Sequence, residues 1–333
     1  MIPEAIGKYR VIAPLGQGRV GLVYRAEDAE SGRAVALKLV PASHFPTPEA
    51  RQKFLQDAQA AVALSHPHLR QLYEAGESGG QLYLAREYLS GSTLQNLLLG
   101  GRVEPVTALA WGIEMAEALA AAHAAGRVHG ELTPKKVFIT EESTVKLLDT
   151  GLWRLSVPSG RDLSEAEKFE QAGLIPPMVA ELAPEQIGGA EPDPRTDLFA
   201  LGVVLYQMIA GENPFVDVEA YQTMQRVLGR EPEPPSVVNP KVPWALDEVM
   251  ARLLEKDPRA RLQGASDAAA ALRAVAAGEP LPAAVTERPV IPVTAAPEAA
   301  APAPKSKLAY WLVAGGIVLA GLLWFLYRTF GQP

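Results

Sequence analysis

Alternating apolar and polar residues mark the first quarter of the chain. Between residues 9 and 90 the segments YRVIAPLG, GLVYRAED, AVALKLV and LYLAREYL repeat with a period of two, which is the side-chain period of a β-strand. One stretch among them, PEARQKFLQDAQAAVAL at residues 48–64, has the apolar spacing of a helix. The pattern predicts a small β-rich lobe, at about residues 9–89, that includes one helix.

Helical spacing predominates from residue 105 to residue 270. The clearest segments are VTALAWGIEMAEALAAAHAAG and TDLFALGVVLYQMIAG. Their last residues, Gly126 and Gly211, suit the left-handed position that closes many helices. We therefore expect a larger helical lobe at about residues 90–272, and an α+β fold of two lobes.

Both periods disappear after residue 276. Residues 277–307 are rich in Pro and Ala, a composition that predicts an extended, semi-rigid linker. Residues 308–327, LAYWLVAGGIVLAGLLWFLY, carry no charge, and a helix of that length spans the ~30 Å hydrocarbon layer of a bilayer. A buried core helix is the alternative, although core helices rarely lack polar residues over such a length. Residues 328–333 would then be a short tail.

The charges beside the apolar segment bear on its orientation. Lys305 and Lys307 precede it and Arg328 follows it, which favours a cytoplasmic N-terminal part. The first residues contain no apolar core of signal-peptide length, so we expect the chain to start in the cytoplasm. The sequence thus predicts a single-pass protein of the inner membrane whose two lobes are cytoplasmic.

Composition excludes several kinds of site. The 333 residues contain no Cys, which rules out disulfides, thiolate nucleophiles and Cys-based metal sites. Five scattered His leave little material for a zinc site. The formal net charge is −7, so no chain-wide basic field favours nucleic acid, and we expect no nucleic-acid partner.

Three glycines lie between the first two predicted strands. Gly16, Gly18 and Gly21 form the pattern G-x-G-x-x-G, but a strand follows them where a dinucleotide-binding fold would have a helix. Glycines at a hairpin tip let backbone amides approach an anion. The next strand places Ala36 where a flat ring would fit and Lys38 where an ammonium reaches phosphates. A lysine alone at a strand end is more often a solvated charge, but the neighbouring glycine loop favours a phosphate-binding role for Lys38.

These motifs belong to an ordered series that resembles a known family. From about residue 9 to residue 272 the chain resembles the bacterial Ser/Thr protein kinases, with the landmarks GQGRVG, VALK, REYL, HGELTPKK, DTG, APE and DPRAR. The resemblance implies the kinase fold and a site for ATP with Mg²⁺. The nucleotide-site residues that it implies are Gly16, Gly18, Gly21, Val23, Ala36, Lys38, Glu87, Leu89, Phe138 and Asp149.

The catalytic loop departs from the family pattern. Where the family has His-Arg-Asp-Leu-Lys-Pro-x-Asn, this chain has HGELTPKK at residues 129–136. Glu131 keeps a carboxylate at the base position but is one methylene longer, and small misplacements slow catalysis strongly. Lys136 replaces the Asn that binds the second metal, and a fixed cation there repels Mg²⁺. The sequence therefore argues against Mg²⁺, although Asp149 remains as its candidate ligand.

Further positions around the site also differ from the family. Thr133 and Gly130 replace a Lys and an Arg of the catalytic loop. Asp57 stands where a helix normally supplies a Glu to Lys38. Each change weakens the expected handling of phosphate charge.

Two substitutions affect packing beside the site. Thr150 replaces the aromatic residue after Asp149, and a buried hydroxyl without a partner costs ~1–3 kcal/mol. Arg86 stands at the back of the adenine pocket, where the family has an apolar side chain and a guanidinium must be paired or solvated. The alternative is that Arg86 turns outward or pairs with Asp57 and leaves the pocket open.

The positions that hold the family's scaffold together are retained. Glu185 of APE and Arg261 of DPRAR match a buried ion pair, and Asp197 and Gly202 match the helix that anchors the catalytic loop. Since the scaffold is kept while the chemistry has changed, we interpret the chain as a membrane-anchored pseudokinase that binds an unidentified protein partner. Two alternatives stay open: a slow Ser/Thr kinase in which Lys136 compensates for the lost charges, and a protein-interaction module that binds no nucleotide.

Overall fold

The computed structural model describes residues 3–17, 21–41, 44–45, 47–152 and 176–287. Two compact units divide the chain, Met1–Pro289 and Val290–Pro333, and every element described below lies in the first. Within the described ranges, no helix is long and apolar enough to cross a membrane. The predicted membrane helix at 308–327 and the tail lie outside the described residues.

The small lobe is built on one antiparallel six-stranded sheet with the order β1-β2-β3-β4-β6-β5. Its strands are β1 (Ala5–Ile6), β2 (Tyr9–Gln17), β3 (Leu22–Asp28), β4 (Ala34–Val40), β5 (Leu72–Ser78) and β6 (Gln81–Glu87). The alternating segments of the sequence correspond to β2, β3, β4 and β6, as predicted. Strand β5, LYEAGES, was not predicted, because polar residues obscure its alternation.

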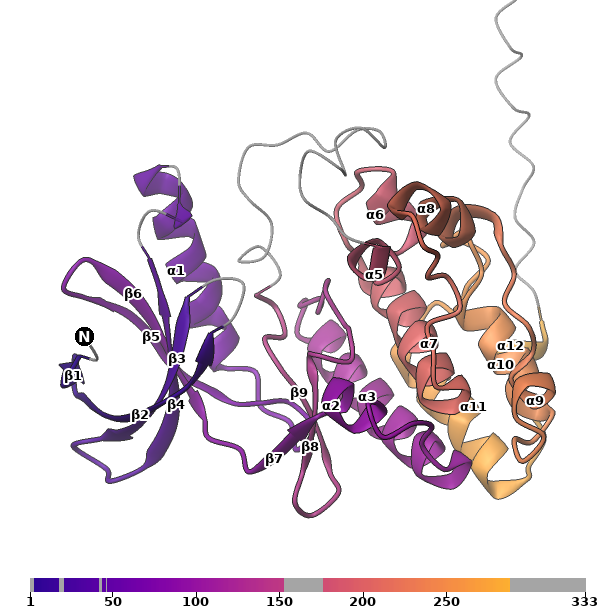
Figure 1. Cartoon of the computed structure of the whole chain (residues 1–333), viewed down its shortest axis with the longest axis horizontal. Helices are drawn as coiled ribbons and strands as arrows, with labels where there is room; N and C mark the ends of the chain where they lie inside the picture. Colours follow the sequence, from indigo (N-terminus) through magenta and orange to yellow (C-terminus); the bar gives the residue numbers. More distant parts are fainter. Residues whose placement is uncertain (1–2, 18–20, 42–43, 46, 153–175, 288–333) are drawn as a thin grey trace, which may run out of the picture. The chain divides into compact units, whose positions relative to one another are not determined.

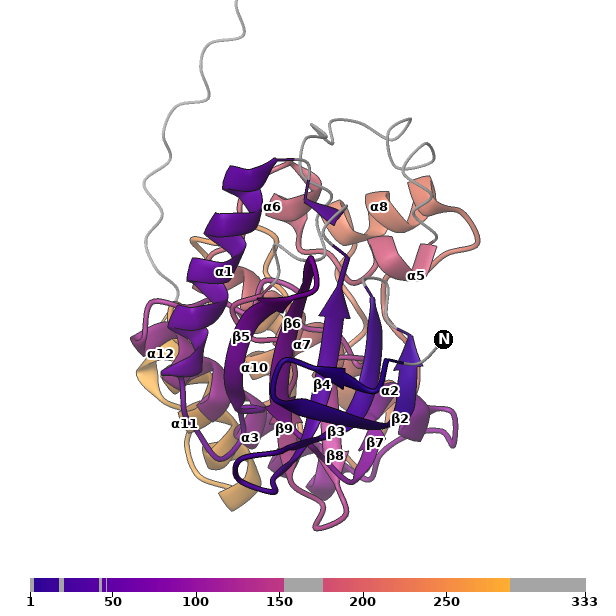
Figure 2. The ribbon, with the colours of Figure 1, turned by 90° about the vertical axis from the view of Figure 1, so that its left-hand side faces the viewer.

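One helix, α1 (Pro48–Val62), covers a face of this sheet and lies beside β5 (Figures 1 and 2). Its N-terminus is capped by Thr47, whose hydroxyl accepts a hydrogen bond from the Ala50 amide at 3.2 Å. The helix buries Phe54 and Ala58 in a cluster with Val40 of β4 and Leu84 of β6. The face of the sheet that carries these residues also carries the site described below.

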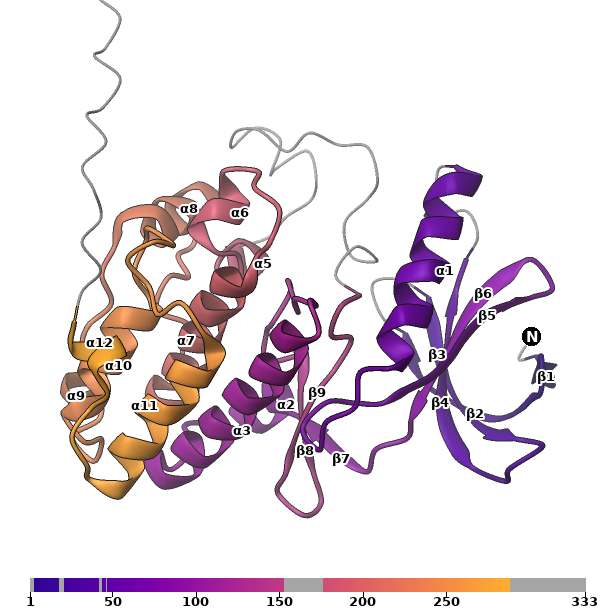
Figure 3. The same cartoon turned by 180° about the vertical axis from the view of Figure 1, so that it is seen from behind.

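The large lobe is mainly helical and contains a second, three-stranded sheet. Its elements are β7 (Gly91–Thr93), α2 (Leu94–Leu98), α3 (Pro105–Ala124), β8 (Val137–Thr140), β9 (Val145–Leu147), α5 (Pro176–Val179), α6 (Pro184–Ile187), α7 (Pro194–Ala210), α8 (Ala220–Gly229), α9 (Pro235–Val238), α10 (Ala245–Leu253), α11 (Ala265–Ala277) and α12 (Ala283–Thr286). Helices α3 and α11 pack against each other along their lengths (Figure 3). The α+β fold of two lobes that the sequence predicts is confirmed.

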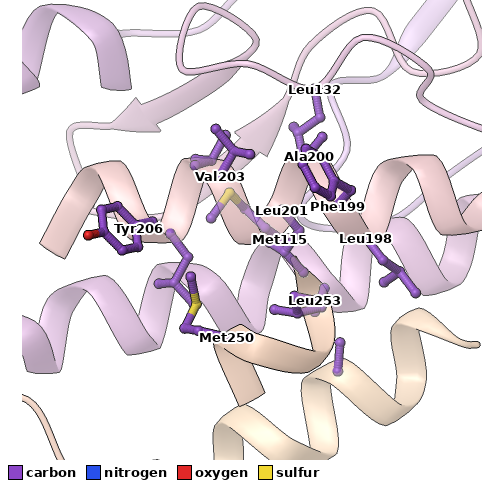
Figure 4. Packing of buried hydrophobic residues seen from close by; sticks show 14 of the residues in the cluster. Met115, Leu132, Leu198, Phe199, Ala200, Leu201, Val203, Tyr206, Met250 and Leu253 are labelled. Carbon is purple, nitrogen blue, oxygen red and sulfur yellow. The ribbon is translucent and has the colours of Figure 1, made fainter. Parts of the chain in front are cut away.

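Helix α7 forms the centre of the large lobe. Its own residues from Thr196 to Ala210 are buried except Gln207, so it is covered on almost every side, as is typical of a core helix. Figure 4 shows Leu201 of this helix among Met115 of α3 and Met250 and Leu253 of α10. Gly211 ends the helix with φ at +86°, the left-handed conformation expected of that glycine.

The folded unit continues past residue 272. Helix α11 ends at Ala277, and the short helix α12 follows within the segment expected to be a linker. Val285 of α12 is buried in the core, and Arg252 donates a hydrogen bond to its carbonyl oxygen at 2.9 Å. An apolar residue inside the Pro- and Ala-rich segment thus fixes residues 283–286 to the lobe. The remainder of the expected linker, from 288 onward, lies outside the described residues.

Candidate functional site

A single buried carboxylate holds the loop at residues 129–136 on helix α7. Asp197 accepts hydrogen bonds at 2.7 Å from the amides of His129 and Gly130, and its Oδ2 lies 2.8 Å from Nε2 of His123. Gly130 has φ at +71°, a conformation that strains most side chains. Burial, more than any neighbouring charge, lowers the pKa of the His129 imidazole. The loop backbone is therefore tied to α7 independently of the side chains that changed.

Asp149 lies just after β9 and is surrounded by cations. Its Oδ2 accepts a hydrogen bond from Nζ of Lys136 at 2.6 Å and lies 3.9 Å from Nζ of Lys38. Its Oδ1 pairs with the guanidinium of Arg86. Both carboxylate oxygens of the expected metal ligand are thus engaged by protein cations.

Arg86 reaches this carboxylate from the sheet of the small lobe. It lies on β6 directly opposite Ala36 of β4, so the two side chains share one face. Only 4% of Arg86 is exposed, and burial followed by the charge of Arg70 lowers its pKa well below the ordinary value. The outward orientation and the pairing with Asp57 that the sequence left open are both wrong. A nearer carboxylate, Asp149, satisfies the guanidinium instead.

Lys136 also approaches the carboxylate at the base position. Its Nζ lies 3.9 Å from Oε2 of Glu131, and its amide donates a hydrogen bond at 2.8 Å to the carbonyl oxygen of Thr133, which is buried. We call Lys38, Arg86, Glu131, Lys136 and Asp149 the Asp149 cluster. Residues expected to serve base, metal and phosphate are brought together in it by ion pairs.

The expected partner of Lys38 is engaged elsewhere. Asp57 of α1 forms an ion pair with Arg127 of the segment after α3, at 3.8 Å. The ion pairs of the described part of the chain include one between Lys38 and Asp149 but none between Lys38 and Asp57. Asp149 thus pairs with Lys38, whereas the carboxylate on α1 that the sequence proposed for it pairs with Arg127.

The hinge at the end of β6 is fixed by polar contacts that the sequence did not suggest. Lys146 of β9 binds both oxygens of the Glu87 carboxylate, at 2.9 and 3.0 Å. Nε of Arg70 donates a hydrogen bond at 2.9 Å to the Glu87 carbonyl oxygen, and burial lowers the pKa of Arg70 to about 10. Leu89 follows the hinge and Phe138 lies on β8, both half-buried.

The glycine hairpin joins β2 to β3. Gly16 pairs with Val23 across the two strands, while Gly18 lies outside the described residues. Gly21 has φ at +80°, and a Cβ there would lie 1.6 Å from the carbonyl oxygen of Leu39. Only glycine fits this close approach of the hairpin to β4.

Thr150 and the scaffold pair behave in opposite ways. In the described ranges the Thr150 hydroxyl is buried with no hydrogen-bond partner. Arg261 is completely buried and forms a bidentate ion pair with Glu185, at 2.6 and 2.7 Å. Gly202 of α7 lies so near Leu254 that a Cβ would come within 2.9 Å of it. The charged groups of Glu185 and Arg261 in the scaffold are therefore paired, whereas the Thr150 hydroxyl beside Asp149 has no partner among the described residues.

The residues of the Asp149 cluster do not fit Mg²⁺. That ion requires several oxygen ligands in near-octahedral geometry and keeps a charge of two. Here Oδ2 of Asp149 is bound at 2.6 Å by the ammonium of Lys136, and Arg86 engages Oδ1. A divalent cation would have to displace these cations against their repulsion.

A glycine hairpin, a lysine on the adjoining strand and a loop anchored to a central helix together define a two-lobed kinase fold. Residues 9–273 match the family model of the protein kinase domain. The chain belongs to the protein kinase family.

Two similar proteins are named as bacterial serine/threonine kinases. A probable serine/threonine-protein kinase of Streptomyces coelicolor is 32% identical over 83% of this chain and 41% of its own length. The serine/threonine-protein kinase PknB of Mycobacterium leprae is 30% identical over 84% of this chain and 44% of its own length. This chain therefore spans about two fifths of these curated relatives.

A solved structure shares the fold. The crystal structure of the Mycobacterium tuberculosis PknI kinase domain superposes with a TM-score of 0.64 at 26% identity. It covers 82% of this chain and 97% of the PknI domain. The kinase resemblance inferred from the motifs is thus confirmed at the level of family and fold.

Proposed function

We propose that the chain is a membrane-anchored pseudokinase, a kinase-fold module that binds a protein partner and does not transfer phosphate. The observation that carries this proposal is the pairing of Asp149 with Lys136, Arg86 and Lys38. Phosphoryl transfer in the family needs this aspartate to hold Mg²⁺ against the nucleotide phosphates. A carboxylate engaged by three cations is poorly suited to that role.

The base position supports the same proposal. Glu131 is longer than the family's aspartate, and its carboxylate lies 3.9 Å from the ammonium of Lys136. A general base must reach the substrate hydroxyl directly, and a displacement of ~1 Å can lower the rate ~10²-fold. Thr133 supplies no positive charge for the transferred group.

The membrane anchor rests on the sequence. Residues 308–327 are apolar over the length of a transmembrane helix, and the Pro- and Ala-rich residues before them suit a spacer. In this proposal the kinase-fold unit lies at the cytoplasmic face of the inner membrane. Fractionation of cells with and without residues 308–333 tests it, and recovery of both forms in the soluble fraction would reject it.

A phosphotransfer assay tests the absence of catalysis. The purified full-length chain is incubated with radiolabelled ATP, Mg²⁺ or Mn²⁺, and a mixture of protein substrates. We expect no label above background. Transfer that disappears in Lys38→Ala would reject the proposal, because it would show that this site does the chemistry.

A weakly active Ser/Thr kinase is the second candidate. Its support is the set of relatives named as serine/threonine kinases, together with the retention of Lys38 and Asp149 side by side at 3.9 Å. In this case Lys136 replaces one metal electrostatically. Lys136→Asn should then alter the Mg²⁺ dependence of label transfer. An unaltered dependence would reject the idea that Lys136 replaces a metal ion.

A further inference from the structure

We infer that the Asp149 cluster binds the phosphates of a nucleoside di- or triphosphate without a divalent metal, with the Lys136 ammonium in the metal's place. This inference rests on the proposed function, since it concerns the same site. Nucleotide binding and phosphate transfer are measured separately, so the two proposals can fail independently.

The charges of the cluster favour an anion. The cations are Lys38, Arg86 and Lys136, and the carboxylates are Asp149 and Glu131. Three cations of the protein thus pair with the single carboxylate of Asp149. Lys38 and Arg86 are at least nine-tenths buried, so their charges act with little screening by water. An anionic group would lower the electrostatic energy of this cluster, whereas a divalent cation would raise it.

The two lysines show where that anion would bind. Nζ of Lys136 lies 2.6 Å and Nζ of Lys38 lies 3.9 Å from the same oxygen of Asp149. Two ammonium groups that share one carboxylate oxygen repel each other. An ammonium carries three N–H donors, and in the proposed complex phosphate oxygens beside Asp149 would accept from both lysines.

The position of Lys136 explains why the metal becomes unnecessary. In a kinase site Mg²⁺ bridges the aspartate and the phosphates and neutralises their charge. Here the ammonium already contacts the aspartate at 2.6 Å, and its stem comes from the loop that α7 anchors through Asp197. A fixed cation of the protein thus takes the bridging place.

The inference predicts an effect of Mg²⁺ opposite to that of an ordinary kinase. Metal-free ATP carries two more negative charges than its magnesium complex, so the cationic cluster should prefer the metal-free form. The adenine end of the site is less favourable to binding. Arg86 lies opposite Ala36, where the ring would lie, and the Glu87 carbonyl oxygen already accepts a hydrogen bond from Arg70. The phosphates should therefore dominate the affinity. Affinity should therefore fall from ATP to ADP to AMP.

The test is a calorimetric titration of the purified full-length chain. ATP, ADP and AMP are titrated in EDTA, and ATP is titrated again with excess MgCl₂. We expect ATP to bind in EDTA and its dissociation constant to rise about tenfold when Mg²⁺ is added. Binding that needs Mg²⁺, or no binding of ATP in either buffer, would overturn the inference.

Two neighbouring lysines provide a matched pair of variants. Lys136→Asn removes the ammonium beside Asp149 and restores the family's residue, so added Mg²⁺ should now strengthen ATP binding. Lys135→Asn makes the same charge change one residue away, at a side chain that is 49% exposed and pairs with Glu181. It should bind like the unmodified chain. An identical response to Mg²⁺ in all three proteins would overturn the role of Lys136.

The outcomes separate this inference from the proposed function. Metal-free binding without label transfer supports both. Label transfer together with metal-free binding rejects the pseudokinase and keeps the site. Absence of both rejects the nucleotide site and leaves a kinase-fold protein module. If Lys136→Asn does not fold, the effect of Mg²⁺ on the unmodified chain decides alone.

Discussion

The guanidinium of Arg86 pairs with Oδ1 of Asp149, across 63 positions of sequence, and joins strand β6 of the small lobe to the segment after β9. The other oxygen of the same carboxylate is bound by Lys136 at 2.6 Å. Asp149 has φ at +60°, a left-handed conformation that Asp tolerates better than most residues. Protein cations thus hold this carboxylate from both lobes at the position where a kinase would hold a metal.

Removing the two partners of this contact should affect stability unequally. Arg86→Met deletes a buried guanidinium whose Nε has no hydrogen-bond partner in the described part of the chain, while Asp149 keeps Lys136 and Lys38. Asp149→Asn leaves the cations without their shared carboxylate. We expect Arg86→Met to change the unfolding free energy by less than ~1.5 kcal/mol and Asp149→Asn to lower it by ~3 kcal/mol or more. Urea unfolding measures both, and equal losses would contradict the arrangement.

The stability that the Glu185–Arg261 ion pair contributes should depend strongly on pH. Burial by itself raises the pKa of Glu185, but the hydrogen bonds and charge of Arg261 outweigh it, and the pKa falls below its ordinary value of 4.5. A lowered pKa in the folded chain stabilises it above pH 4.5, and the stabilisation is lost as the pH falls through the lower value. Glu185→Gln should therefore lose ~3–5 kcal/mol at pH 7 and progressively less in acid.

An exposed pair on the same lobe provides the control for this variant. Asp257 binds Arg259, whose side chain is 59% exposed. Exposed pairs contribute little, so Asp257→Asn should lose less than ~1 kcal/mol at pH 7. Urea unfolding at a series of pH values distinguishes the two cases. A Glu185→Gln deficit that stays constant from pH 7 to pH 3 would contradict the assignment.

The fold could be predicted from the sequence because its signals are local. Alternation placed β2, β3, β4 and β6, and helical spacing placed α1, α3 and α7. Strand β5 was missed because Glu74 and Glu77 interrupt its pattern, although Leu72 and Ala75 are buried against α1. Helix α12 was missed because its composition matches that of a linker, and the burial of Val285 is a tertiary effect.

The partners of the site residues were less accessible to sequence reasoning. Family order indicated that Lys38 and Asp149 come together, as they do at 3.9 Å. The choice of Asp57 for Arg127, and of Asp149 for Arg86, depends on which opposite charge is nearest in space. Spacing along the chain carries no information on that distance, so each pair needed the three-dimensional structure.

Removing the Thr150 hydroxyl should stabilise the folded chain. It is buried and finds no hydrogen-bond partner among the residues with described positions. Thr150→Val replaces it with a methyl group of similar shape, so we expect a gain of ~1 kcal/mol in unfolding free energy. Thr196→Val is the control, because the Thr196 hydroxyl donates to Glu185 at 2.8 Å and its loss should cost ~1–2 kcal/mol. Thermal unfolding compares the two, and a loss in Thr150→Val would show that the hydroxyl is bound in solution.

Lys256 carries a charge that the fold tolerates poorly. Its Nζ lies 4.1 Å from the ring centre of Phe215 and 5.4 Å from that of Phe199, and it has no hydrogen-bond partner within the described ranges. Burial, followed by the charge of Arg261, lowers its pKa from 10.5 to about 8. Cation–π attraction to the rings offsets only part of the loss of hydration.

The sign of the pH effect follows from that lowered pKa. Below pH 8 the folded and unfolded chains both carry the proton, and the folded chain bears the full penalty of a buried ammonium. Between pH 8 and 10.5 the folded chain loses its proton first, so its stability should rise. Lys256→Met should be more stable than the unmodified chain by ~1 kcal/mol at pH 7, with the difference closing toward pH 10.5. Lys241→Met, at a side chain that is 72% exposed, should show neither effect. Urea unfolding at pH 7, 8.5 and 10 measures both variants, and a Lys256→Met difference that is absent at pH 7 or unchanged at pH 10 would show that the ammonium is well accommodated.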